Sequence, residues 1–255
     1  MTKIFAITNQ KGGVGKTTTS VNLAASLTAS GKRVLLVDLD PQANATMGSG
    51  TNKQTVKTTV YQILLGESAI QATRITGTRG KYDLIPANRD LAGAEVEMVD
   101  LPQREARLKT ALEAIEQEYD YILIDCPPAL NLLTLNGLCA AQAVMIPMQC
   151  EYYALEGLSD LVNTIKRVRH NFNPRLRIEG LLRTMFDPRN ILAQQVSDQL
   201  QKHFGDKVYR TVIPRNIRLA EAPGFGVPVL YHDGQSKGAQ AYLELAKEIL
   251  DAEHL

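Results

Sequence analysis

Two lysines and three glycines stand close together near the start of the chain. The segment reads Lys11-Gly12-Gly13-Val14-Gly15-Lys16-Thr17-Thr18 and lies between an apolar run and a helical pattern. Glycines let backbone N–H groups turn toward phosphate oxygens, and the N-terminus of the following helix attracts anions. The segment therefore predicts a phosphate-binding loop, with Lys16 on the β- and γ-phosphates, Thr17 on Mg²⁺ and Thr18 on the α-phosphate.

The loop departs from the standard P-loop pattern at its first position. Gln10 stands where that pattern has a glycine, and a second lysine, Lys11, stands at the mouth of the loop. Taken alone, Lys11 is simply an exposed loop lysine. Any further role for it has to come from the rest of the sequence.

Two apolar runs end in an aspartate. Asp38 closes the run 34–38, and Asp125 closes the run 121–125. A carboxylate at the carboxyl end of a buried strand, beside a phosphate loop, can hold Mg²⁺ directly or through water. We assign contact with Mg²⁺ through water to Asp125 and expect Asp38 to be structural, for example as a helix or turn cap.

Short apolar runs alternate with helical patterns along the chain, and several runs are apolar at consecutive positions, as in strands covered on both faces. This predicts an α/β fold: a single domain over residues 1–255, with a mostly parallel twisted sheet flanked by helices on both faces and ligands at the carboxyl ends of its strands. The expected strands are 3–8, 33–38, 82–86, 121–125, 143–148, 178–185 and 208–213. The expected helices are 17–30, 88–99, 103–118, 130–140, 155–171, 189–204 and 235–252. Residues 49–80 carry no recognisable motif.

Composition excludes several classes of protein. Hydrophobic residues make up 44% and charged residues 22% of the 255, which excludes a disordered or low-complexity chain. The three cysteines form no Cys-x-x-Cys pair, which argues against a disulfide scaffold or structural zinc and fits a reducing compartment. No signal peptide or bilayer-spanning run is present in the sequence, so we expect a soluble cytoplasmic protein.

The charge is unevenly distributed along the chain. The net charge is +1, but residues 1–159 carry −2, residues 160–218 carry +7 and residues 219–255 carry −4. A basic segment inside a neutral protein is a candidate surface for a phosphate backbone. For any single lysine or arginine in it, a solvated helix face is the simpler explanation.

Further runs resemble the Soj/ParA-type chromosome-partitioning ATPases, which carry a deviant Walker A loop of the kind found here. The resemblance extends over nearly the full length, and the run 151–157 discriminates well because P-loop chemistry does not demand it. The matching runs are ITNQKGG (7–13), VDLDPQ (37–42), LAGAE (91–95), QCEYYALEG (149–157) and PRN (214–216).

The resemblance implies an ATPase switch with ATP and Mg²⁺ as cofactors. Lys11 would reach across a homodimer interface to the partner's nucleotide, and Asp40 would orient the attacking water, so that Lys11, Lys16 and Asp40 form the catalytic set. Pro214 and Asn216, with Met185, would lie against the adenine. The residues expected to bind ATP are Lys11, Gly12, Gly13, Val14, Gly15, Lys16, Thr17, Thr18, Met185, Pro214 and Asn216.

The resemblance also implies partners. The ATP-bound homodimer would bind double-stranded DNA without sequence preference through Arg189 and Arg218, which both lie in the +7 segment. A ParB-type protein would accelerate a slow hydrolysis and release the DNA. We expect the protein to be associated with the nucleoid and to make no contact with a membrane. We also expect no separate N-terminal DNA-binding domain.

Three alternatives share the same fold. A membrane-attached MinD-type ATPase needs a basic amphipathic C-terminal helix, whereas here the apolar stripe from Tyr242 to Leu250 lies among mostly acidic residues and is better explained as core packing. A nitrogenase iron protein needs cysteines that bridge a cluster, and Cys126 lacks the glycine-flanked pattern. A metabolic ligase of the dethiobiotin or cobyrinate amidation type needs a small-molecule acceptor.

Overall fold

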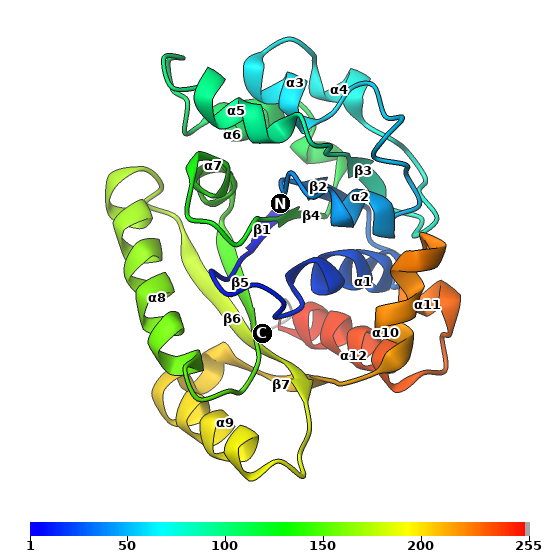
Figure 1. Cartoon of the computed structure of the whole chain (residues 1–255), viewed down its shortest axis with the longest axis vertical. Helices are drawn as coiled ribbons and strands as arrows, with labels where there is room; N and C mark the ends of the chain where they lie inside the picture. Colours follow the sequence, from blue (N-terminus) through cyan, green and yellow to red (C-terminus); the bar gives the residue numbers. More distant parts are fainter. Residues whose placement is uncertain (253–255) are drawn as a thin grey trace.

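A computed structural model describes residues 1–252. Its centre is a seven-stranded sheet in the order β3-β2-β4-β1-β5-β6-β7 (Figure 1), and every neighbouring pair is parallel. All seven expected strands are confirmed, and the sheet is wholly rather than mostly parallel. The strands are β1 Lys3–Ile7, β2 Val34–Asp38, β3 Asp83–Ile85, β4 Tyr121–Asp125, β5 Ala143–Met148, β6 Arg177–Phe186 and β7 Val208–Pro214.

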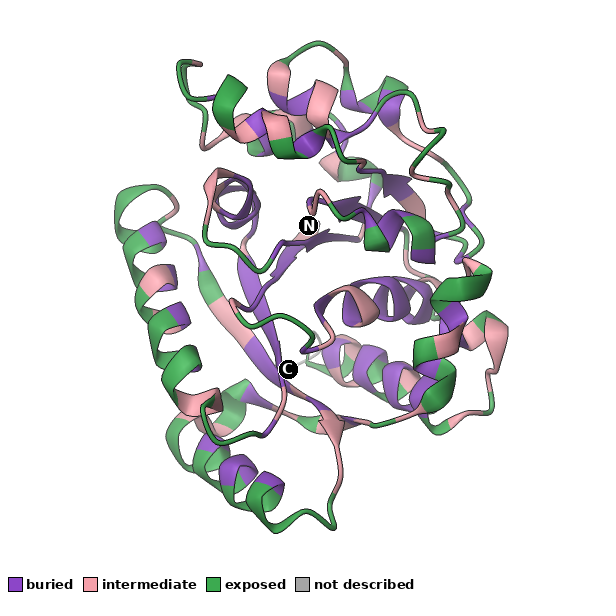
Figure 2. Ribbon diagram, viewed as in Figure 1, coloured by how far each residue is buried: buried purple, intermediate pink, exposed green. Residues whose placement is uncertain are grey.

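Both faces of the sheet are buried, which explains the consecutive apolar residues in the strands. In β1, Ile4 and Ala6 join the core on one face, while Phe5 and Ile7 join the core on the other. Successive side chains of a strand point to opposite faces, so a strand with helices on both sides is apolar at every position. Figure 2 shows the result as buried central strands and exposed outer helix faces.

The helices form one layer on each face (Figure 1). The layer over Phe5 and Ile7 contains α1 (Lys16–Ala29), α2 (Asn44–Gly48), α10 (Ile217–Glu221), α11 (Val229–His232) and α12 (Lys237–Asp251). The layer over Ile4 and Ala6 contains α3 (Val60–Leu65), α4 (Ile70–Thr73), α5 (Leu91–Glu97), α6 (Arg107–Glu113), α7 (Leu132–Ala140), α8 (Ala154–Asn171) and α9 (Ile191–Phe204).

Short helices account for most of what the sequence pattern missed. Residues 49–80, which carry no motif, contain α3 and α4, and α3 starts with a capping box between Thr59 and Gln62. The expected helix 103–118 is shorter and divided: Gln103 adopts a left-handed conformation with φ of 52°, α6 begins only at Arg107, and a separate 3₁₀ turn, Glu116–Glu118, follows. Helices of four to six residues are too short to show a hydrophobic period. The remaining 3₁₀ turns are Gly205–Lys207 and Ala222–Phe225.

The apolar stripe near the C-terminus belongs to the core, as expected. Helix α12 packs on α1 and β7, and Tyr242, Leu245 and Ile249 are buried there. The Tyr242 hydroxyl lies 3.1 Å from Thr19 Oγ1 of α1. Within residues 1–252, no helix has the length and apolarity needed to cross a membrane.

Gly137 allows α7 to lie close to the end of β4. A Cβ at this position would stand 2.8 Å from Cys126 Sγ and 3.3 Å from the Leu39 side chain. We expect Gly137→Ala to lower the free energy of unfolding by about 1–3 kcal/mol, because overpacking a dense core forces its neighbours to move. Urea denaturation measures this change.

Gly157 of α8 provides the matched control. No atom lies within 4 Å of a Cβ built there, so Gly157→Ala should leave stability unchanged or raise it by up to about 1 kcal/mol through helix propensity. Equal effects of the two substitutions would contradict the close packing of α7 on β4.

Candidate functional site

The phosphate loop connects β1 to α1 and depends on two glycines. Gly13 and Gly15 have φ angles of 74° and 86°, a left-handed conformation that glycine adopts without strain. Gly15 is the N-cap of α1 and makes no side-chain cap, so the first N–H groups of a 14-residue helix remain available to an anion. The expected loop is therefore present at the carboxyl end of the central strand.

Lys16 lies inside this loop. Its side chain is largely buried, with the residue 7% exposed, and its Nζ donates to the Lys11 carbonyl at 3.0 Å. Burial lowers the pKa of the Lys16 ammonium, while the negative charges of Asp125 and Asp40 oppose that shift. A buried cation at the uncapped N-terminus of a helix is suited to a phosphate.

Asp125 and Thr17 come together as the sequence predicts. Asp125 ends β4, its Cα pairs with that of Ile7 at the end of β1, and Thr17 Oγ1 donates to its Oδ2 at 2.7 Å. Ser20 Oγ, which the sequence did not single out, donates to Oδ1 at 2.8 Å. Burial and the nearby charge of Asp38 raise the pKa of the Asp125 carboxyl, and the two hydroxyls counteract this.

A hydroxyl and a carboxylate in contact are oxygen donors that suit Mg²⁺. No group of three or more His, Cys, Asp or Glu that could hold a metal occurs within residues 1–252. Magnesium in nucleotide sites takes one or two protein ligands and completes its shell with phosphate and water oxygens. Thr17 and Asp125 therefore fit a Mg²⁺ ion that arrives with a nucleotide.

Asp38 fixes the loop that carries Asp40. Its buried Oδ2 accepts hydrogen bonds from Thr46 N and Thr46 Oγ1, both at 2.7 Å, and its Oδ1 accepts one from Asp40 N at 3.2 Å. Burial raises the pKa of Asp38 despite these bonds. The structural role expected for Asp38 is confirmed, because these hydrogen bonds hold the backbone and the Thr46 hydroxyl of this loop.

Asp40 is only partly buried and faces the phosphate loop. Its Oδ1 accepts a hydrogen bond from Gln42 N at 2.8 Å, which orients the carboxylate. Its negative charge raises the pKa of Lys16 and of Asp125, which places it within electrostatic range of both. The side chain thus lies partly exposed, close enough to the phosphate loop to act on its charged groups.

Lys11 points out of the loop instead of into it. Its Nζ forms an ion pair with Glu151, and both side chains are about half exposed, at 47% and 51%. Asn9 supports the turn, because its Oδ1 accepts from Lys11 N at 3.0 Å and its Nδ2 donates to Pro147 O at 2.8 Å. Glu151 belongs to a run that the sequence singled out, but only the folded chain identifies it as the partner of Lys11.

Met185, Pro214 and Asn216 line one cavity together with Gly15 and Thr18 of the phosphate loop. Its volume is about 190 Å³. The three residues come from the ends of β6 and β7, so the predicted base-binding residues do converge beside the loop. The cavity is also lined by Leu219 and Ala220, which closely follow Asn216, and by Tyr242 of α12, which is too distant in sequence for a motif to connect it with them.

Two of these residues also have structural roles. Met185 adopts a left-handed conformation with φ of 49°, and Asn216 caps α10 by accepting from Arg218 N at 3.1 Å. Beside Met185, Thr184 Oγ1 donates to Val14 O at 2.7 Å. The base cavity is thereby connected to the phosphate loop.

Arg189 and Arg218 follow β6 and β7, at the same edge of the sheet as the loop. Arg189 is strongly exposed and contacts both carboxylate oxygens of Asp187, at 3.0 and 2.8 Å. Arg218 contacts Glu221 at 2.8 Å and Asp233 at 3.2 Å. Both arginines are therefore exposed but already paired with carboxylates.

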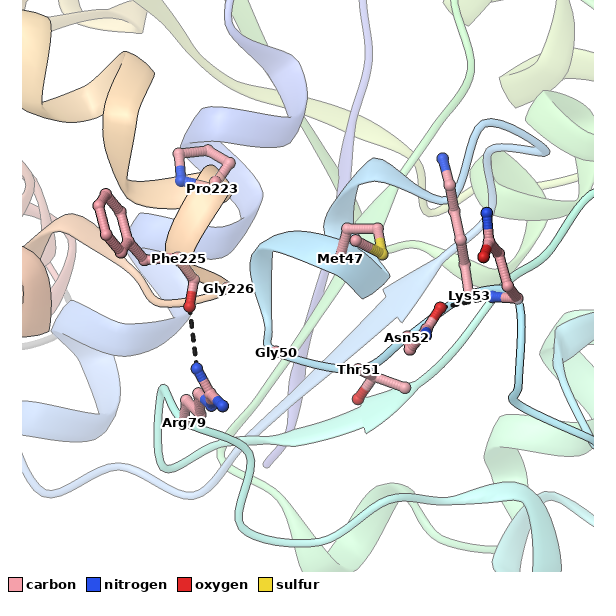
Figure 3. Close-up of a pocket in the computed structure, with 11 residues that line it drawn as sticks. Met47, Gly50, Thr51, Asn52, Lys53, Arg79, Pro223, Phe225 and Gly226 are labelled. Atoms are coloured by element: carbon pink, nitrogen blue, oxygen red, sulfur yellow. Dashed lines mark hydrogen bonds between the residues drawn. The ribbon is translucent and has the colours of Figure 1, made fainter.

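A separate cavity of about 370 Å³ lies between residues 47–54 and 223–226 (Figure 3). Arg79 Nη1 donates to Phe225 O at 2.9 Å across its rim. Gly50 and Gly226 approach so closely that a Cβ on Gly50 would lie 2.8 Å from Gly226 O. This contact joins the chain after α2 to the chain after α10, and none of the predicted site residues lies in it.

The three thiols are buried and unpaired. They are Cys126, Cys139 and Cys150, and burial raises the pKa of each. Ligands of a cluster shared between subunits need to reach the surface as thiolates. Their burial argues against a shared cluster.

Thr46 should be a sensitive position, because its hydroxyl donates to Asp38 and accepts from Ala87 N at 2.9 Å. Thr46→Val removes this hydroxyl, so the Ala87 N–H loses its acceptor and the Asp38 carboxylate loses one of its hydrogen bonds. We expect a loss of about 1–3 kcal/mol in the free energy of unfolding by urea denaturation. Thr46→Ser keeps the hydroxyl and should lose less; an equal loss in both variants would point to packing.

Comparison with known proteins agrees with this geometry. Residues 2–178 match the family described as AAA domain. The chain is 57% identical over 249 residues to the sporulation initiation inhibitor protein Soj of Bacillus subtilis, covering 98% of each chain. It is 51% identical over 253 residues to the chromosome partitioning protein ParA of Caulobacter vibrioides, covering 98% of this chain and 95% of that protein.

A solved structure is also similar over nearly the whole chain. It is a cobyrinic acid a,c-diamide synthase from Mycobacterium smegmatis with bound ATP analogue and magnesium. The TM-score is 0.86 at 39% identity, covering 98% of this chain and 95% of that one. Full-length identity above 50% to Soj and ParA, together with the phosphate loop, shows that the chain belongs to the Soj/ParA family of chromosome-partitioning P-loop ATPases.

Proposed function

We propose that this ATPase is a dimerisation switch: ATP joins two subunits, the dimer binds DNA without sequence preference, and hydrolysis releases it. The position of Lys11 is the observation that carries this proposal. The loop already contains one buried lysine for its own phosphates, Lys16, while Lys11 stands outside on the surface. A second cation in that position can serve the nucleotide of another subunit.

The chemistry needs little from the protein beyond position and charge. Lys16 would bind the β- and γ-phosphates, Thr17 would hold Mg²⁺ directly and Asp125 would hold it through water. The metal ion would neutralise developing charge on the phosphate oxygens. Asp40 would orient the attacking water, and such a residue does not have to be a strong base because positioning dominates phosphoryl transfer.

The ion pair between Lys11 and Glu151 suits a lysine that changes partner. Exposed ion pairs contribute roughly 0–1 kcal/mol, so Lys11 can leave Glu151 at small cost. A triphosphate at the interface offers more negative charge than one carboxylate. In the proposed dimer, each Lys11 therefore exchanges its own carboxylate for the partner's nucleotide.

Arg189 and Arg218 would present the DNA-binding face. We propose non-specific double-stranded DNA as the partner, because contacts to phosphates need no base reading. We also propose that a ParB-type protein accelerates a slow hydrolysis and that the protein is cytoplasmic and associated with the nucleoid. The names of its relatives, which are chromosome-partitioning proteins, support this.

Specific observations bear on two alternative functions, a membrane-attached MinD-type ATPase and a metabolic amidation enzyme. A MinD-type membrane helix is disfavoured, because the apolar face of α12 is used against α1 and β7. A metabolic amidation enzyme is supported by the name of the Mycobacterium smegmatis structure at 39% identity. The higher identity to Soj and ParA favours the partitioning function.

Substitution of Lys11 and Asp40 separates the steps of the switch. Lys11→Ala should bind ATP almost as well as the unaltered protein but fail to dimerise, because only the side chain that crosses the interface is removed. Asp40→Ala should dimerise with ATP and remain dimeric, because hydrolysis is lost. Light scattering with ATP and with ADP measures both effects. An Asp40→Ala protein that stays monomeric with ATP would exclude the role given to Asp40.

The experiment that tests the function is a gel shift on random-sequence duplex with ATP, with ADP and without nucleotide. We expect binding with ATP only, weakening steeply as salt rises. The double substitution Arg189→Glu with Arg218→Glu should abolish it while ATP-dependent dimerisation persists. Binding that is independent of nucleotide, or unchanged between low and high salt, would contradict the proposal.

Turnover assays address the amidation enzyme directly. In the proposed function, DNA with a ParB-type protein raises the rate of ATP hydrolysis, while cobyrinic acid with an amide donor leaves it unchanged. Stimulation by the small-molecule acceptor alone would replace the partitioning function by the metabolic one.

A further inference from the structure

A third arginine stands between the two that the family resemblance nominates. Phe186 of β6 pairs with Pro214 of β7, so the next residues, Asp187 and Arg215, leave the sheet side by side. Asp187 holds Arg189, and Arg215 precedes Arg218 by three residues. Arg189, Arg215 and Arg218 therefore form one group at the carboxyl ends of β6 and β7, here called the arginine face.

The three members of the arginine face differ in how far their charge is already balanced. Arg189 has a two-point contact with Asp187, and Arg218 lies between Glu221 and Asp233. Arg215 is exposed, and within residues 1–252 no carboxylate lies within ion-pair distance of it. It is the member of the face with an unneutralised charge.

The electrostatics of Asp187 agree with this arrangement. The Arg189 guanidinium lowers the pKa of the Asp187 carboxyl to about 2, and the charge of Arg215 adds to that effect. Asp187 therefore stays ionised at any ordinary pH. It contacts Arg189 and lies within electrostatic range of Arg215, and one carboxylate charge against two guanidinium charges leaves an excess of positive charge at the surface.

We propose that Arg215 is a third DNA-phosphate contact on the arginine face and that Asp187, Glu221 and Asp233 limit the contribution of the other two arginines. This inference rests on the proposed DNA binding and adds a residue to it. A phosphate that binds Arg189 or Arg218 displaces a carboxylate already in place. A phosphate that binds Arg215 breaks no ion pair of the protein, so the release of counterions from the DNA favours binding without that cost.

The basic residues of the +7 segment lie in different parts of the fold, and only some of them belong to the arginine face. Arg167 of that segment lies in α8 and lines a groove with residues of α5 and α7, to which the turns after β6 and β7 contribute no residue. Arg210, also exposed, lies in the first half of β7, five residues before Arg215. The arginine face therefore holds only part of the positive charge of the +7 segment.

The test compares Arg215→Ala with Arg210→Ala by fluorescence anisotropy on a random-sequence duplex at several salt concentrations. Because Arg215 also borders the base cavity, the ATP affinity of each variant is measured first and DNA affinity is compared at saturating ATP. We expect Arg215→Ala to weaken binding about 5- to 10-fold at 0.1 M salt and to reduce the salt slope by about 0.9 for each phosphate that is no longer neutralised. Arg210→Ala should change neither quantity, and Arg215→Lys should keep the slope.

Asp187→Asn gives an independent readout outside the base cavity. Removing this charge frees Arg189 and strengthens the field of Arg215, so DNA affinity should rise several-fold with a steeper salt slope. An unchanged slope in Arg215→Ala at saturating ATP, or unchanged or weaker binding by Asp187→Asn, would overturn the inference. If the unaltered protein does not bind DNA with ATP, the proposed function itself fails; if it binds and only Arg215→Ala has no effect, the inference fails alone.

Discussion

Two buried carboxylates on adjacent strands impose the central constraint on this structure. Asp38 and Asp125 end β2 and β4, and their Cα atoms are register partners. Both side chains are 0% exposed, so each lacks solvent and each repels the other. Such a pair is tolerated only where donors surround it, and here the donors are the hydroxyls and N–H groups of Thr17, Ser20 and Thr46.

The rest of the site follows from the need to supply hydrogen-bond donors to the carboxylates of Asp38 and Asp125. Thr17 and Ser20 must come from the first turns of α1, which fixes the helix over the end of β4 and brings Lys16 close enough to feel the charge of Asp125. Thr46 must come from α2, which closes the turn carrying Asp40. A site built this way concentrates negative charge, and it therefore favours Mg²⁺ and a lysine at the point where phosphates would enter.

Most of the framework can be predicted from sequence, because it depends on local patterns. Buried strands have consecutive apolar residues, and the phosphate loop has glycines where the backbone turns. Partners of charged groups cannot be predicted in this way. Glu151 beside Lys11, and Asp233 beside Arg218, are far apart in sequence and meet only in the folded chain. The same limit applies to the distribution of charge, since a +7 segment contributes to more than one surface once it is folded.

A protein with a net charge near zero can bind a polyanion as a dimer and not as a single subunit, if its basic residues share one face and carboxylates balance part of their charge. One subunit has a net charge of +1, and two of the three cations on its arginine face are paired with carboxylates. In the proposed function, the affinity of one such face for DNA would be small, because each paired arginine gains little. In the proposed dimer, a second identical face binds the same duplex at a high effective concentration, and linked weak contacts can exceed either one by about 10²–10⁴-fold. Weak binding by each subunit is then what makes the response to ATP steep, since a more basic subunit would remain on DNA without its partner.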